Sequence, residues 1–195
     1  MLNDLTSILS LLETRRSGKP REMIAPGPSP DELERILTIA ARTPDHGKLF
    51  PWRFVVVAAD QREALADLLT RALPESDPEA LPAHYAKAAE FAYQAPTLVV
   101  VVSAPIARHK IPLWEQELSS GAAAMNLLIA AHALGYVGGW ITGWAAYSER
   151  VRAAFCAPGE RIAGFVFLGT AGTPLEERPR APLSTVVRRW VPPEA

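Results

Sequence analysis

Cysteine is nearly absent from this 195-residue chain, in which Cys156 is the only one. One cysteine cannot form an internal disulfide, and it leaves no CxxC pair for a zinc site. We therefore expect neither disulfide exchange nor metal–thiolate chemistry, and no metal site. Because disulfides persist in oxidising compartments, this composition favours a reducing environment and a cytoplasmic protein.

The sequence also lacks an excess of either charge and a long apolar run. It has 20 Lys and Arg against 21 Asp and Glu, a net charge of -1, so it offers no broad basic surface for nucleic acid or for an anionic membrane. No stretch approaches about 18 apolar residues, and near the N-terminus the apolar residues precede the arginines, the reverse of a secretory signal. We expect a small-molecule partner, with no nucleic acid and no membrane.

Several motifs of common enzymes are missing. The chain has no GxGxxG, no phosphate-binding GxxxxGK[ST], no HExxH and no GxSxG. A Rossmann dehydrogenase and a serine hydrolase are therefore disfavoured. The four histidines show no ligand-like spacing, so they do not indicate a metal site.

Apolar periodicity and capping residues predict helices and strands in one domain spanning residues 1–195. Few strands separated by helices favour an α+β class, or mixed α/β layers, around a central sheet. The expected strands cover residues 54–59, 97–103 and 162–168. A first helix is expected to end near Arg16, and a second to begin at Ser29 and to be ended by Pro44. Further helices are expected over residues 84–93 and 117–134.

The helix over residues 117–134 is almost wholly small or aliphatic, although Asn126 and His132 lie inside it. A helix that is apolar on nearly every side has to be buried. Because a chain of this size has limited interior, we expect part of this helix to pack against a second copy of the chain. His132 is expected to be a core histidine with one satisfied ring nitrogen.

Two cationic groups flank the first two expected helices. Arg15, Arg16 and Ser17 follow the first helix, where cations also complement the carbonyl end of a helix. Arg42, His46 and Lys48 lie in the proline-containing stretch ARTPDHGKLFPWRF, which by itself is equally compatible with a solvated turn. Taken together, the two groups indicate an anionic ligand.

The stretch VGGWITG, residues 137–143, is the third candidate element. Paired glycines allow a backbone to approach a flat ring closely, and Thr142 supplies a hydroxyl, although a plain turn into a strand explains the stretch almost as well. A phosphate that requires arginines and a planar polar ring that requires backbone contacts together describe a nucleotide-like cofactor. Spacing alone does not identify it.

Four stretches in order resemble the FMN-dependent nitroreductase family, most closely its minimal bacterial subgroup of NAD(P)H nitroreductases. They are RRS, ARTPDHGKLFPWRFVVV, GAAAMNLLIAAHALGYVGGW and RIAGFVFLGTAGTP, and they span nearly the whole chain. The resemblance implies a nitroreductase-like fold, with a central, mostly antiparallel sheet flanked by helices. It also implies an intertwined homodimer with two FMN molecules at the subunit interface.

The same resemblance implies which residues hold FMN. Arg15, Arg16 and Ser17 of one subunit would contact the phosphate and the pyrimidine edge, and Arg42 and His46 would come from the other subunit. A C-terminal tail from about residue 173 would wrap the partner. The remaining implied contacts are Trp140, Ile141 and Thr142 beside the isoalloxazine, and Arg180 as an added phosphate contact.

The implied activity is an FMN-dependent NAD(P)H oxidoreductase that passes a hydride to a nitroaromatic, a quinone or a similar small-molecule acceptor. No side chain is named as catalytic, because the chemistry is expected on FMN itself. Donor and acceptor would use the same flavin face in turn, which predicts ping-pong kinetics. The alternatives are a flavin-binding or storage protein with little turnover, and an interaction module that has lost its cofactor.

Overall fold

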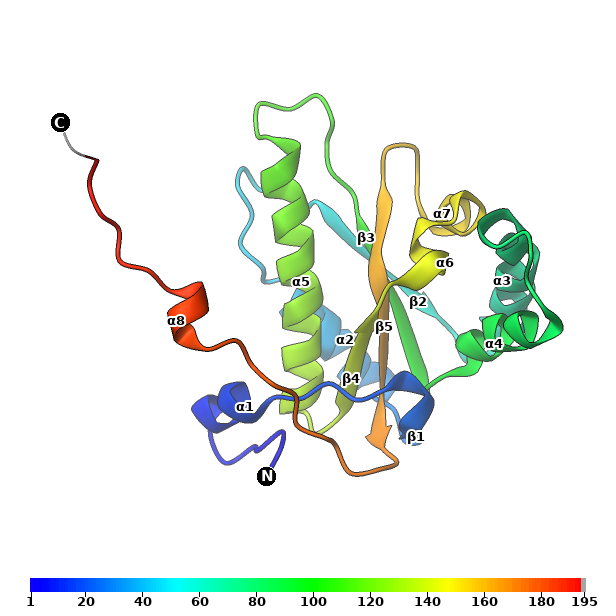
Figure 1. Cartoon of the computed structure of the whole chain (residues 1–195), viewed down its shortest axis with the longest axis horizontal. Coiled ribbons are helices and arrows are strands. Elements are labelled where there is room, and N and C mark those ends of the chain that lie inside the picture. Colours follow the sequence, from blue (N-terminus) through cyan, green and yellow to red (C-terminus); the bar gives the residue numbers. More distant parts are fainter. Residues whose placement is uncertain (194–195) are drawn as a thin grey trace.

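A single antiparallel sheet forms the centre of the computed structural model, which describes residues 1–193 (Figure 1). Strand β3 pairs with β2 on one side and with β5 on the other, and β4 pairs with the opposite edge of β5. The short β1 pairs with the end of β5. The strands are β1 (Met23–Ile24), β2 (Trp52–Val57), β3 (Thr97–Ser103), β4 (Val137–Ile141) and β5 (Arg161–Ala171).

Helices cover both faces of this sheet, and each face has its own apolar core. Helices α2 and α5 pack on one face, around Ile36, Leu127 and Val166, and the other helical group packs around Leu69, Phe165 and Phe167. A central, mostly antiparallel sheet flanked by helices is therefore confirmed. The helices are α1 (Ile8–Thr14), α2 (Pro30–Ala40), α3 (Arg62–Ser76), α4 (Pro82–Tyr93), α5 (Leu113–Ala133), α6 (Gly143–Tyr147), α7 (Glu149–Phe155) and α8 (Leu183–Val186), with 3-10 turns at Pro20–Glu22 and Ala59–Gln61.

Local sequence explains where several elements begin and end. Ser29 and Glu32 form a complete capping box at the start of α2, with Pro30 at the first helical position. Strand β3 has the expected bounds, while α1 ends at Thr14, two residues before the expected Arg16. The chain already turns extended at Arg15, so Arg15 and Arg16 lie beyond the helix.

Helix α5 is largely buried against the sheet, but its first turns are exposed. Leu127 and Ala131 face β3, β4 and β5, whereas Leu113, Trp114 and Leu118 are 44%, 67% and 53% exposed. The expectation of a helix buried on nearly every side therefore holds within one chain only for its second half. No helix within residues 1–193 is long and apolar enough to cross a membrane.

After β5 the C-terminal tail first runs along the body of the molecule, where Arg16 donates to the Glu176 carbonyl, and then extends away from it (Figure 1). It carries the single-turn helix α8, which has no buried residue. Leu183, Val186, Val187, Trp190 and Val191 are all at least 64% exposed. A tail with this many apolar side chains in water lacks a packing surface in the single chain.

Candidate functional site

The segment from Arg15 to Gly18 runs beside β4 and begins the candidate site. The main-chain N–H of Gly18 donates to the carbonyl of Gly138 at 3.2 Å. This contact occupies part of the β4 edge that does not pair with β5. The arginine side chains are therefore held next to the strand that carries Trp140 and Ile141.

Arg15 lies in a cluster of three guanidinium groups and has no carboxylate partner among residues 1–193. Its Nη1 donates to the hydroxyl of Ser17 at 3.3 Å, and Nη2 of Arg180 donates to the Arg15 carbonyl at 3.2 Å. Burial lowers the pKa of Arg15, and the charges of Arg180 and Arg16 lower it further. Arg180 pairs with the Glu177 carboxylate at 3.2 Å, so among the described residues Arg15 is the member of this cluster that lacks a carboxylate. Its guanidinium is suited to bind an anion.

Arg16 points toward the start of the C-terminal tail. Its Nε donates to the Glu176 carbonyl at 2.7 Å and lies 4.0 Å from the Glu177 carboxylate. Arg16 and Ser17 also line a cavity of about 430 Å³ between this segment and the tail. The structure therefore brings Arg15, Arg16, Ser17 and Arg180 together.

Strand β4 presents main-chain groups at its free edge. Gly138 donates to His132 Nε2 at 3.2 Å and accepts from Gly18, so both of its main-chain groups point away from β5. The main-chain groups of strand residues two positions apart point to the same edge of the strand. The N–H and C=O of Trp140 therefore point to the same free edge as those of Gly138. The Trp140 indole lies over the neighbouring strand β5, where its Nε1 donates to the Ala163 carbonyl at 3.0 Å.

The paired glycines of β4 are required by packing within the chain. A Cβ on Gly139 would lie 2.7 Å from the Gly18 carbonyl oxygen, too close for any side chain. A Cβ on Gly138 would lie 2.5 Å from the Leu128 side chain. Because these glycines lack a side chain, the Arg15–Gly18 segment and α5 can pack closely against β4. Close approach to a flat ring is therefore not needed to explain them.

A second cavity, of about 520 Å³, opens at the far end of β4. Ile141 and Thr142 form one wall of it. Most of the remaining lining is apolar and comes from α3, α4 and α6, with Asp77, His84 and Lys87 also at the cavity. The three residues expected beside a flavin ring therefore run from the exposed Trp140 to the mouth of this cavity. A volume of this size is in the range of small-molecule sites.

His46 lies away from the arginine cluster within one chain. Arg42 and His46 are both exposed, and His46 Nδ1 is 2.8 Å from the Glu115 carboxylate at the start of α5. His132, near the arginine segment, is at the other end of α5. Because the helix between Glu115 and His132 is about 25 Å long at a rise of ~1.5 Å per residue, one chain does not join His46 to the arginine cluster. Arg42 precedes Thr43, which accepts from Asn126 in the second half of α5 at 2.7 Å.

His132 is a core histidine with one satisfied nitrogen, which confirms the expectation from the sequence. It is fully buried, its Nε2 accepts from Gly138, and its Nδ1 has no partner among residues 1–193. Burial, with a smaller contribution from Arg15, lowers its pKa to about 4. The ring is therefore neutral near pH 7, with its proton on Nδ1.

Two contacts at the site were not predicted from the sequence. Asn3 hydrogen-bonds the main chain of Arg16, and Glu176 accepts from the Arg16 side chain. Neither residue belongs to a motif, and the second contact joins positions 160 apart. No local pattern signals either of them.

Comparison with known proteins places this chain in one family. A model of the nitroreductase family matches residues 12–170. The chain is 37% identical over 165 residues to the "Putative NAD(P)H nitroreductase YdjA" of Escherichia coli (strain K12), covering 83% of this chain and 87% of that protein. It is 39% identical over 166 residues to the "Putative NAD(P)H nitroreductase" of Haemophilus influenzae, with the same two coverages of 83% and 87%.

Solved structures show the same fold. The Nitroreductase-like Family Protein from Bacillus cereus superposes with a TM-score of 0.79 at 22% identity, covering 94% of this chain and 96% of that one. A nitroreductase with bound FMN from Bacteroides fragilis gives a TM-score of 0.67 at 24% identity, covering 90% and 95%. The family model covers most of the chain and the sequence relatives cover most of its length, so this chain belongs to the nitroreductase family.

Proposed function

We propose that this nitroreductase family member is an FMN-dependent NAD(P)H oxidoreductase that passes a hydride to a nitroaromatic, a quinone or a similar small acceptor. The names of its relatives support the NAD(P)H-dependent activity, and the Bacteroides fragilis structure supports FMN. The observation that carries the proposal is the half-buried guanidinium of Arg15, which lies beside Arg16 and Arg180 without a carboxylate partner in the described chain.

The donors at this cluster fit the phosphate of FMN. A phosphate monoester carries up to two negative charges and accepts several hydrogen bonds, and planar guanidinium groups match its geometry. Arg15, Arg16 and Arg180 supply the cations, and Ser17 supplies a hydroxyl. Like charges repel one another here, and a bound dianion would offset that repulsion.

The residues beyond this cluster fit a flavin ring. The free edge of β4 at Trp140 offers a main-chain donor and acceptor, which match the polar edge of an isoalloxazine. Ile141 and Thr142 continue along the strand to the apolar cavity of about 520 Å³. We propose that the ring lies along these three residues, with the phosphate at the arginine cluster.

A homodimer would complete the site. His46 does not reach the Arg15 cluster within one chain, and we propose that it comes from a second copy together with Arg42. Exposed apolar residues on the first turns of α5, on α1 and on α8 offer a surface for that copy. We propose that the tail from about residue 173 wraps the partner.

Bound FMN would supply the hydride chemistry between NAD(P)H and the acceptor. The protein's own residues then have three tasks, which are to hold the phosphate, to orient the ring against β4 and to leave one ring face open. A cation near the pyrimidine edge would also stabilise the negative charge of the reduced ring. No side chain needs to act as a nucleophile, and we propose that this chemistry takes place in the cytoplasm.

The first test is an absorbance spectrum of purified protein that has been incubated with FMN and desalted, followed by anaerobic addition of NADPH or NADH. Retained yellow colour that bleaches supports the oxidoreductase. Retained colour that does not bleach favours a flavin-binding or storage protein. If no flavin is retained, the cofactor assignment is wrong.

A further inference from the structure

The N-terminal segment is tied to the arginine segment by one asparagine side chain. Asn3 Nδ2 donates to the Arg16 carbonyl at 3.1 Å, and the Arg16 N–H donates to Asn3 Oδ1 at 2.7 Å. The Asn3 N–H donates to the Thr14 carbonyl at 3.1 Å, and the Asp4 N–H donates to the Thr14 hydroxyl at 2.9 Å. One side chain therefore satisfies both main-chain groups of Arg16.

Asparagine suits this position for two reasons. Its backbone is left-handed, with a φ of 53°, a conformation that asparagine tolerates better than most residues. Its side-chain amide has both a donor and an acceptor, so it can bind an N–H and a C=O together. Alanine would lose both bonds and strain the backbone, whereas glycine would lose both bonds and keep the backbone.

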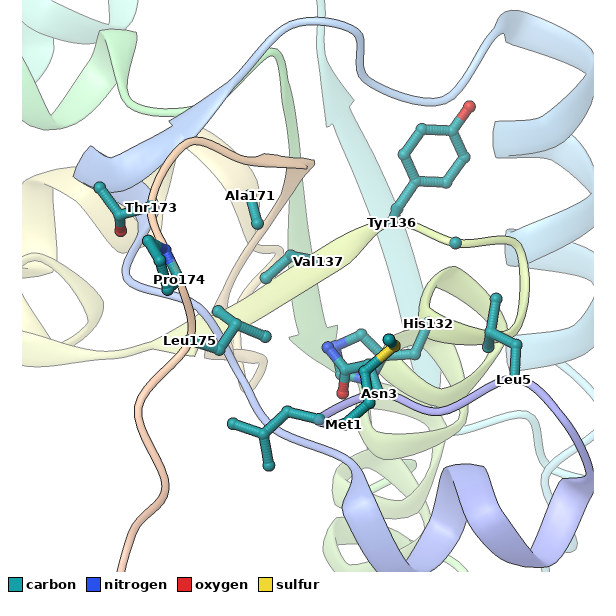
Figure 2. Close-up of a pocket in the computed structure, with 12 residues that line it drawn as sticks. Met1, Asn3, Leu5, His132, Tyr136, Val137, Ala171, Thr173, Pro174 and Leu175 are labelled. Carbon is teal, nitrogen blue, oxygen red and sulfur yellow. The ribbon is translucent and has the colours of Figure 1, made fainter.

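The asparagine contact holds the stretch between α1 and Gly18, whose other contacts come from the tail through Glu176 and Arg180. Arg15 and Arg16 lie beyond the end of α1, and the next main-chain bond is the one from Gly18 to Gly138. Figure 2 shows Asn3 and Met1 next to His132, where the N-terminal segment covers a cavity of about 390 Å³. The N-terminal segment therefore lies between the C-terminal end of α5 and the two arginines, Arg15 and Arg16.

We propose that Asn3 is a positioning residue for the phosphate of FMN, because it fixes the main chain from which Arg15, Arg16 and Ser17 project. This inference rests on the proposed function. Asn3 itself does not contact the phosphate, since both ends of its amide are already bound to Arg16. Its effect is to order the arginine side chains before the cofactor arrives, which lowers the entropy lost on binding.

The test compares FMN with riboflavin, which has the same ring but no phosphate. Asn3→Gly keeps the left-handed backbone and removes both side-chain bonds. Flavin fluorescence measures the two dissociation constants for wild type and variant. We expect about tenfold weaker FMN binding, which corresponds to about one ordinary hydrogen bond, and unchanged riboflavin binding.

Asp4→Asn is the matched control. Asp4 lies in the same turn, its carboxylate accepts from the Thr6 N–H at 2.9 Å, and it contacts no arginine. This variant should bind both flavins as wild type does. Because Asn3 belongs to neither apolar core, Asn3→Gly is expected to stay folded, and urea unfolding checks this.

Two results would overturn the inference. FMN binding that is unchanged in Asn3→Gly would show that the asparagine bonds do not order the site. An equal loss of FMN and riboflavin affinity would show a general structural effect. Wild type that binds neither flavin would instead overturn the proposed function, and the inference with it.

Discussion

Arg15 and Arg16 are adjacent in sequence but have different partners. Arg15 has only the Ser17 hydroxyl and two neighbouring cations, whereas Arg16 binds the main chain of the tail at Glu176. Arg15 is thus free to bind an anion directly. Arg16 would bind one while also linking the site to the start of the tail.

Arg16→Ala should weaken FMN binding by about 1.5–3 kcal/mol, the usual value of a hydrogen bond to a charged group. The measurement is a titration followed by flavin fluorescence. Arg35→Ala, which removes an exposed arginine from α2, should leave the affinity unchanged. Equal affinity of wild type and Arg16→Ala would place the phosphate elsewhere.

His132 should make stability depend on pH. Its pKa of about 4 in the folded protein lies below its ordinary value of 6.5, so the unfolded chain binds more protons between these values and stability rises with pH. Full stability is present above about pH 6.5 and is lost as the pH falls toward 4. Between about pH 7 and pH 5, wild type should lose about 2 kcal/mol more than His132→Leu.

Urea unfolding at several pH values measures this difference. The other three histidines, His46, His84 and His109, are exposed and are present in both proteins, so the comparison isolates His132. Equal losses in the two proteins would mean that the folded protein accommodates a protonated His132.

At the level of elements, the contact between β4 and the arginine segment depends on the absence of a side chain at Gly139. Gly139→Ala would place its Cβ 2.7 Å from the Gly18 carbonyl oxygen, and a main-chain atom cannot move aside as a side chain can. We expect a loss of about 1–3 kcal/mol in the free energy of unfolding, as for other overpacked sites. FMN binding should weaken as well.

Gly121→Ala is the matched control for this prediction. Gly121 lies within α5, its φ is not left-handed, and the nearest atom to an added Cβ is 4.0 Å away. Alanine should be neutral there or stabilise the helix by up to about 1 kcal/mol. If the two variants unfold alike, the close approach of Gly18 to β4 does not constrain the fold.

At the level of the whole molecule, the exposed tail predicts an oligomer. A chain truncated after Ala181 keeps Arg180 but loses the exposed apolar residues of α8 and beyond. If these residues wrap a second copy, truncation should weaken the dimer and shift it toward monomer at micromolar concentration. Sedimentation velocity of the full and truncated chains makes the comparison, and a full-length chain that is monomeric would contradict the proposed dimer.

Catalysis by the FMN-loaded protein should follow ping-pong kinetics. The absence of a dinucleotide-binding motif fits a nicotinamide that binds transiently at the flavin face and leaves before the acceptor arrives. Initial rates at varied NADPH and acceptor concentrations should give parallel double-reciprocal lines. Intersecting lines would indicate that both substrates bind together.

Local signals in the sequence predicted much of the fold. The capping box at Ser29 and Glu32, the valine-rich strand at Thr97–Ser103 and the apolar run of α5 each depend on neighbouring residues, and the structure confirms all three. Part of the site was also predictable, because Arg15, Arg16 and Ser17 are consecutive. The separation of His46 from them was not visible from spacing. The apolar helix predicted a second copy of the chain, but only the resemblance implied that this copy contributes residues to the site.

The sequence by itself determined the types of element, the buried position of His132 and the cationic stretch after α1, because capping, periodicity and composition act over a few residues. Only the tertiary structure decided that β4 has a free edge, that Asn3 holds Arg16, and that Arg180 joins Arg15 from 165 positions away. These contacts depend on how the sheet and helices pack. Residues that are far apart in the sequence form them, so local sequence patterns do not predict them.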